Sequence, residues 1–427
     1  MEEAKHKKPQ QARSRAFGGD AALWIIIAAL AIISLLAVYS STASMAYKRA
    51  GGDTSFYMLT HMRFLLLGFI VLFVIHRFNY QSYYRYIRIL FMISLGLMAM
   101  TFFVGEDTHE AARSIRIPII NLTFQPADML KITLVMVLAK ELGKKQMEIA
   151  KLKLLPVIPI NLKVSDKQRE KNRAIIHDVT LPLLLPVVLA CGMIFISNFS
   201  TSALVFVSCL VMLYVGRVKV RELWRLVRIT VVTVVVAVAV MYPLDLGRSR
   251  IWVNRVTSFM GVENPSEMTE DEIVAREMSK NQVQNAKMAI ASGRGLGRGP
   301  GHSVQRTNLP LPFSDYVYAF IAEEYGLLGA FVVLALYLWL FFRTIVIFQR
   351  CEKSFPSLLV LGLGITIVMQ AFISMLVAVD LFPVTGLPMP FISLGGSSVL
   401  FTSVALGLIL GISRQMQEKT INQTPQS

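Results

Sequence analysis

The chain has 427 residues, of which 54% are hydrophobic and 16% are charged, and its mean hydropathy is +0.56. This composition excludes an ordinary soluble globular protein and indicates a membrane protein. The net charge of +16 comes without any nucleic-acid-binding motif or aromatic platform, so no nucleic-acid partner is predicted.

Apolar runs long enough to cross a bilayer recur along the sequence. We predict an all-α polytopic membrane protein with ten transmembrane helices and a large extracytoplasmic loop between the seventh and eighth. The first run has no A-x-A-like exit, so we expect it to be kept as a helix. The ten predicted spans are 22–42, 57–76, 86–104, 124–140, 179–197, 200–216, 226–243, 316–345, 355–379 and 390–412.

Lysine and arginine in the short loops give the orientation. The N-terminal tail 1–20 and the loop 141–178 are rich in both, so both are predicted to be cytoplasmic. With ten spans the C-terminal tail 414–427 is also cytoplasmic, and 244–315 lies outside. Residues 21–413 then form one membrane domain in the cytoplasmic (inner) membrane.

Cysteine and histidine do not indicate a metal site. Cys191, Cys209 and Cys351 lie in or beside apolar spans without a CxxC pattern, and we interpret them as packing residues. The six histidines include no HExxH motif. A structural metal is therefore not expected.

The outer segment 244–315 has a patterned middle and a glycine-rich end. Ser266 or Thr269 could cap a helix that the sequence predicts to continue until Ser292 and Gly293. After it comes Gly-Arg-Gly-Leu-Gly-Arg-Gly-Pro-Gly, which resembles a phosphate cradle only weakly. Two interpretations stay open: a flexible basic loop, or a backbone that binds an anion beside Arg294, Arg298 and Arg306.

Three acids follow where the chain enters the next span. Acids inside a membrane helix cost about 2.5–3.5 kcal/mol at its centre, which makes them functional candidates. Asp315 stands at the junction, where it could also be a helix N-cap. Glu323 lies about 80° and Glu324 about 180° around the helix from it, so at least one Glu is expected to pair with a cation or to line a different polar pocket.

Three long motifs resemble a known family. Gly-Pro-Gly-His-Ser-Val-Gln-Arg at 299–306, followed by Phe-Ser-Asp-Tyr at 313–316, is similar to the signature of the SEDS proteins, the FtsW/RodA group of peptidoglycan glycosyltransferases. Phe-Gln-Pro-Ala-Asp at 124–128 and Pro-Val-Thr-Gly-Leu-Pro-Met-Pro at 383–390 match further family motifs. The residues of the first motif and the basic N-terminal tail favour the division-type members over the elongation-type ones.

The resemblance implies an enzyme that polymerises lipid II, a disaccharide-peptide on undecaprenyl diphosphate, outside the membrane. The acid matching Asp315 is the residue taken as essential. We assign it as the general base that takes the proton from the acceptor 4-hydroxyl, which attacks the donor anomeric carbon with inversion. Because diphosphate leaves as a stable anion, one carboxylate suffices where glycoside hydrolases use two.

Other residues follow from the same resemblance and its chemistry. Candidates for binding the diphosphate or the sugars are Lys131, Arg250, Arg255, Gln284, Arg294, Arg298, Ser303, Gln305 and Arg306. For Gln284, Ser303 and Gln305 a purely structural role in the loop stays open. Polar-pocket candidates are Asp128, Glu323, Glu324, Thr385, Ser393 and Ser397. A divalent cation, Mg²⁺ or Mn²⁺, could assist, and the expected partners are a class B penicillin-binding transpeptidase and division (divisome) membrane proteins.

Some positions depart from the family pattern. Ser114 stands where the family has tryptophan, Asp128 replaces a glutamate, and Asn198 replaces an aspartate. An acid at 198 is therefore not available in this chain.

Two other classes of function share part of this pattern. A lipid flippase or transporter would also have many spans and intramembrane acids, with broken helices such as 383–390 could form. A scaffold protein of the division machinery would need no acid at 315. Against a transporter, the polar residues gather in one outer loop and no internal repeat is evident.

Overall fold

The computed structural model describes residues 18–41, 55–104, 115–117, 122–149, 175–244, 249–261, 270–304 and 316–423. Its helices are α2 (Ala21–Ser41), α4 (Ser55–Arg77), α5 (Tyr80–Val104), α6 (Pro126–Ile149), η2 (Ile176–Thr180), α8 (Leu181–Ser197), α9 (Phe199–Val215), α10 (Val220–Met241), α11 (Ser249–Met260), α12 (Glu270–Gly293), α13 (Val317–Arg350), α14 (Ser354–Ala378) and α15 (Gly396–Gln423). Two short strands, β1 (Ile115–Ile117) and β2 (Leu122–Phe124), pair antiparallel with Ile115 opposite Phe124.

The chain is a polytopic helical membrane protein. Within the described residues, eight helical segments are long and apolar enough to cross a membrane, and each coincides with a predicted span. They are α2, α4, α5, η2 with α8, α10, α13, α14 and α15. The predicted spans 124–140 and 200–216 coincide with the more polar α6 and with the 17-residue apolar α9.

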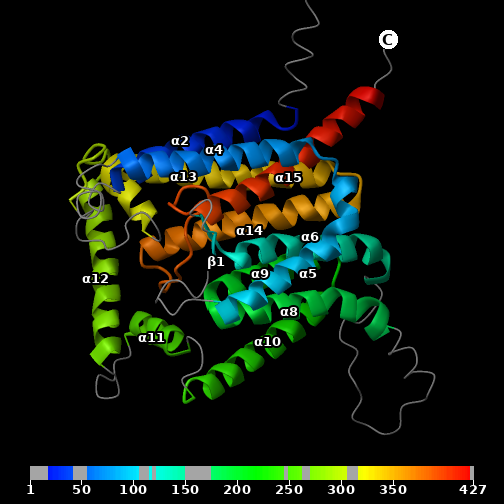
Figure 1. Ribbon diagram of the computed structural model, residues 1–427, viewed down its shortest axis with the longest axis horizontal. Coiled ribbons are helices and arrows are strands. Elements are labelled where there is room, and N and C mark those ends of the chain that lie inside the picture. Colours follow the sequence, from blue (N-terminus) through cyan, green and yellow to red (C-terminus); the bar gives the residue numbers. More distant parts are fainter. Residues whose placement is uncertain are drawn as a thin grey trace, which may run out of the picture.

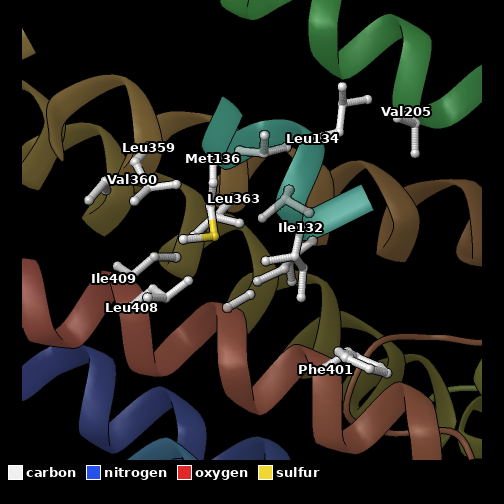
Figure 2. Close-up of a cluster of buried hydrophobic side chains, with 14 of the residues drawn as sticks. Ile132, Leu134, Met136, Val205, Leu359, Val360, Leu363, Phe401, Leu408 and Ile409 are labelled. Atoms are coloured by element: carbon white, nitrogen blue, oxygen red, sulfur yellow. The ribbon is translucent and has the colours of Figure 1, made fainter. Parts of the chain in front are cut away.

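The long helices lie side by side, and α12 stands across one end of the bundle (Figure 1). α6, α14 and α15 form the middle of the core, where Ile132, Met136, Leu363 and Ile409 are buried against one another (Figure 2). α10 is different, because its valine-rich surface is largely exposed. Exposed apolar side chains on a membrane helix are those that face lipid or another membrane protein.

A stretch without regular structure, residues 379–395, enters the bundle between α14 and α15. Its backbone carbonyls accept hydrogen bonds from helix side chains: Pro388 O from Gln370 Nε2 at 2.8 Å and Ile392 O from Ser34 Oγ at 3.0 Å. The Tyr337 hydroxyl donates to Pro390 O. Irregular backbone at membrane depth is tolerated only when its polar groups are satisfied by protein, and these three side chains do so.

Tyr337→Phe should lower the stability of this arrangement. Tyr337 is fully buried, so the change leaves the Pro390 carbonyl without that donor and costs about 1–3 kcal/mol. Thermal unfolding of the purified protein in detergent measures the effect. The control is Tyr214→Phe at an exposed position, and equal melting temperatures for the two variants would contradict the assigned hydrogen bond.

The cysteines are free thiols, as predicted for packing residues. Cys209 is buried against the core, and Cys191 and Cys351 are partly buried. α12 spans the region predicted to be helical, ending at Gly293, and α15 continues past residue 413 to Gln423.

Candidate functional site

The first turns of α13 contain two fully buried acids, Glu323 and Glu324. Glu323 Oε2 accepts a hydrogen bond from Ser303 Oγ at 2.5 Å, and its Oε1 accepts from Val304 N at 2.9 Å and Ser292 Oγ at 3.4 Å. Glu323 therefore binds both the end of α12 and the segment that follows it.

Glu324, the next residue, binds the same segment at another point. Its Oε1 accepts from Gly301 N at 3.0 Å and from the Ser40 hydroxyl at the end of α2. Gly301 N also lies 3.1 Å from Ser40 Oγ. The described donors to both glutamates are thus hydroxyls and backbone amides, and the two acids attach residues 292–304, here called the glycine segment, to α13 and α2.

Backbone hydrogen bonds join the glycine segment to an interruption in α13. Gly326 has φ +70° and ψ −170°, which breaks the helix ladder. Leu327 N and Leu328 N donate instead to Arg294 O at 3.0 Å and Gly295 O at 3.4 Å. In return Glu323 O and Glu324 O accept from amides of the segment at 3.0 and 2.9 Å. The backbone groups released by the kink are therefore satisfied.

The glycine at the end of α12 is required by close approach. A Cβ built on Gly293 would lie 1.9 Å from Ala322 O, a backbone atom. By contrast, a Cβ on Gly295 meets nothing within 4 Å. The segment is packed against α13 at Gly293 and open at the next glycine, Gly295.

These contacts correct both interpretations of the glycine-rich sequence. The part up to residue 304 is not a freely flexible loop, because two carboxylates and four backbone bonds attach it to α13. It is also not an anion cradle through the amides of Arg298, Gly299, Gly301 and Val304, since each donates to a protein oxygen. The side chains of Arg294 and Arg298, both exposed, stay as anion-binding candidates here.

Four of the candidate cations fall into two groups at opposite ends of α12. Arg294 and Arg298 follow its last turn, where they line an open surface hollow. Arg250 and Arg255 are half-buried on α11, which the chain separates from the start of α12 by residues 261–269. With 24 residues, α12 is about 36 Å long, and Figure 1 shows α11 near the end of α12 farther from α2 and α13.

α11 is held against the junction of α8 and α9 by aromatic packing. The Trp252 ring centroid lies 5.0 Å from that of Phe195 and 5.7 Å from that of Phe199. Asn198, at the junction itself, caps α9 by accepting a hydrogen bond from Thr201 N at 3.3 Å. A capping amide at 198 is thus a structural role that needs no acid.

Lys131 and Asp128 form an ion pair of 2.8 Å on α6, and both are largely buried. Lys131 Nζ also donates to Gln370 Oε1 at 2.8 Å, and Gln370 in turn holds Pro388 O. Lys131 is therefore connected to the 379–395 stretch. The other polar candidates of this region, Thr385, Ser393 and Ser397, are buried, and Ser393 Oγ accepts from Met389 N at 2.8 Å.

A second ion pair, which the sequence did not suggest, joins α12 to the residues after α14. Lys287 Nζ contacts Asp380 Oδ2 just after the end of α14. Ala286, Tyr316 and Ala378 pack together beside this pair, whereas Gln284 is exposed on α12. The available signal was an acid directly after an apolar span, at Asp380.

Asp315, Gln305, Arg306 and Ser114 lie outside the described residues. The next described residue, Tyr316, is the N-cap of α13 and makes no side-chain capping hydrogen bond. Among the described residues, no group of three or more His, Cys, Asp or Glu side chains could hold a metal ion.

Residues 20–418 match the family model FtsW/RodA/SpoVE, described as a cell cycle protein. The chain belongs to this family. As an FtsW/RodA/SpoVE member with several apolar helices, it is an integral protein of the inner, or cytoplasmic, membrane.

Relatives and solved structures agree with the family. The chain is 28% identical over 412 residues to a probable peptidoglycan glycosyltransferase FtsW of Aliivibrio salmonicida, covering 95% of this chain and 91% of the relative. A solved structure on coordination of polymerization and crosslinking by a peptidoglycan synthase complex has TM-score 0.66 at 21% identity, covering 93% and 98% of the two chains. The rod shape determining protein RodA of Thermus thermophilus gives TM-score 0.58 at 20% identity, covering 93% and 97%.

Proposed function

We propose that this chain is a peptidoglycan glycosyltransferase that polymerises lipid II into glycan strands on the outer face of the cytoplasmic membrane during septal wall synthesis. The observation that carries the proposal is the family match over residues 20–418, together with full-length relatives named as such enzymes. Those relatives carry the division-type name, which favours septal over elongation synthesis.

The proposed topology has ten spans, in which α6 and α9 join the eight long apolar helices. The tail 1–20 and the loop 141–178 are then cytoplasmic, as their lysines and arginines favour. With ten spans the tail 414–427 is cytoplasmic as well. The membrane domain is 21–413, and the segment 244–315 with α11 and α12 lies outside as the catalytic loop. On this outer side of the membrane the donor is linked to a lipid and needs no nucleotide.

Asp315 is the proposed general base. It accepts the proton of the acceptor 4-hydroxyl as that oxygen attacks the donor anomeric carbon, while the bond to the diphosphate breaks and the lipid diphosphate leaves as an anion. The residues on both sides of 305–315 are fixed: Val304 N binds Glu323, and Tyr316 is buried between α12 and α14. Such anchoring restricts where a base on this segment can reach.

Cations near the base would stabilise the leaving diphosphate. Arg294 and Arg298 have exposed guanidinium groups on the glycine segment and are the first candidates. Arg250 and Arg255, at the far end of α12, are better placed for another part of a long lipid-linked substrate. Lys131, Gln284, Ser303, Gln305 and Arg306 stay as further candidates.

The partner proposed from the family is a class B penicillin-binding transpeptidase, with other division membrane proteins. The solved complex with TM-score 0.66 concerns both polymerization and crosslinking. The exposed valine-rich side of α10 offers apolar surface for a membrane helix of such a partner.

A flippase is the main competing function, and proteoliposomes separate the two. The purified chain is reconstituted with fluorescent lipid II, and both loss of inner-leaflet label to an external quencher and formation of glycan polymer are measured. The proposal expects polymer, because the outer-leaflet substrate is consumed. Lipid movement without polymer would favour the flippase, and neither signal with or without the transpeptidase would favour a scaffold.

Charge exchange tests whether the Lys287–Asp380 ion pair, which joins α12 to the end of α14, supports the reaction. Lys287→Asp and Asp380→Lys should each lower the polymerisation rate, because each places like charges together where α12 meets α14. The double exchange restores an opposite pair and should recover most of the rate. The pair is partly exposed, so the expected effect on stability is small, about 1 kcal/mol or less. Double and single variants that are equally slow would contradict a positioning role.

A further inference from the structure

A cavity lies at the end of the bundle opposite to α12, and the proposed reaction does not use it. Its volume is about 780 Å³. It is enclosed by the start of α2, the start of α5, the end of α13, the start of α14 and the last turns of α15, which lie together in Figure 1. Under the proposed topology this end faces the cytoplasm.

The walls of this cavity are held by specific contacts. Gly19 N donates to Gln417 Oε1 at 3.0 Å, and Arg343 Nε donates to Asp20 Oδ2 at 3.0 Å. Tyr80 N lies 3.4 Å from Gln415 Oε1. α15 is thus attached to both α2 and α5, and α13 to α2. The cavity is therefore formed by the fold itself.

The charges around the cavity favour an anion. Its lining has four cations and two acids, and Asp20 is already paired with Arg343. Among the described residues, neither Arg350 nor Lys419 has a carboxylate within ion-pair distance. Lys353 lies over the Tyr80 ring, with its Nζ 5.9 Å from the centroid. Burial raises the pKa of the Cys351 thiol to about 11, so that wall stays neutral.

Apolar residues line the rest of the cavity. Val346, Ile347, Pro356, Ile412 and Met416 line it. A free phosphate ion gains nothing from contact with apolar side chains. A phospholipid has a phosphate that can contact the cations and a glycerol-acyl part that can contact the apolar side chains. Basic pockets between membrane helices on the cytoplasmic side are sites of this kind.

We propose that this cavity binds the headgroup of an anionic phospholipid of the inner leaflet. Arg350 and Lys419 contact the phosphate, and the apolar residues contact the beginning of the acyl chains. The side of the membrane rests on the proposed topology. The binding itself does not depend on polymerase activity, so the two can fail separately.

Native mass spectrometry of the full chain in detergent tests this site by titrating phosphatidylglycerol. The double variant Arg350→Gln, Lys419→Gln should bind about fivefold more weakly for each charge removed. Glu352→Gln should bind about fivefold more tightly, because it removes an acid from the rim. The matched control is Arg221→Gln, Arg228→Gln, which removes two exposed cations of α10 outside the cavity and should leave binding unchanged.

Two further arms identify the ligand. Phosphatidylcholine at equal concentration should bind more weakly than phosphatidylglycerol, and inorganic phosphate should not displace the lipid at equal concentration. Loss of binding in the α10 control equal to that in the cavity variant would overturn the site. Displacement by inorganic phosphate would overturn the assignment to a lipid.

Discussion

Replacing Asp315 with asparagine is expected to reduce glycan polymerisation by about 10²–10⁴-fold, the usual contribution of a positioned general base. Asparagine keeps the size and hydrogen-bonding capacity of the side chain but cannot accept the proton. Rates are measured with purified protein and lipid II, and thermal unfolding is measured on the same preparations.

The choice of asparagine also separates catalysis from helix capping. Asparagine and aspartate are about equally good N-caps, so a capping residue would tolerate this change. An Asp315→Asn protein that polymerises at the wild-type rate would show that the base is elsewhere.

Gly293→Ala is expected to destabilise the protein strongly and to abolish polymerisation with it. The new Cβ would lie 1.9 Å from Ala322 O, and backbone on both sides leaves little room for relaxation. Overpacking of this kind costs about 1–3 kcal/mol and sometimes more. The displaced segment contains hydrogen-bond donors to Glu323 and Glu324, so both buried acids would lose hydrogen bonds as well.

The neighbouring Gly295 provides the matched control. A Cβ there meets nothing within 4 Å, so Gly295→Ala should be neutral or slightly stabilising. The melting temperature and the polymerisation rate are compared for the two variants. A Gly293→Ala protein as stable as Gly295→Ala would contradict the close packing of the segment on α13.

The helices were largely predictable from the sequence, because a membrane span must be both long and apolar. The predicted run 355–379 corresponds to α14 at Ser354–Ala378, and 22–42 corresponds to α2 at Ala21–Ser41. The end of α12 was also predicted, since Ser292 and Gly293 interrupt the helical pattern. In each case the signal is local in the chain.

The site itself was less predictable, because its contacts join residues far apart in sequence. The buried acids were recognised as costly, yet nothing in the sequence indicates that Ser40 would donate to Glu324. Gly326 is one of two glycines in the α13 sequence, and its interruption of the helix became interpretable only with the carbonyls of the glycine segment beside it. Helical spacing gives the face of a side chain but not its partner.

Glycan polymerisation in detergent by the purified chain tests the central claim most directly, since no bilayer or gradient is present for transport. The wild-type protein, alone or with its transpeptidase, is incubated with lipid II beside the Asp315→Asn variant at matched folded concentration. We predict polymer from the wild type and essentially none from the variant. Equal polymer from both proteins, or none from the wild type under either condition, would contradict the account.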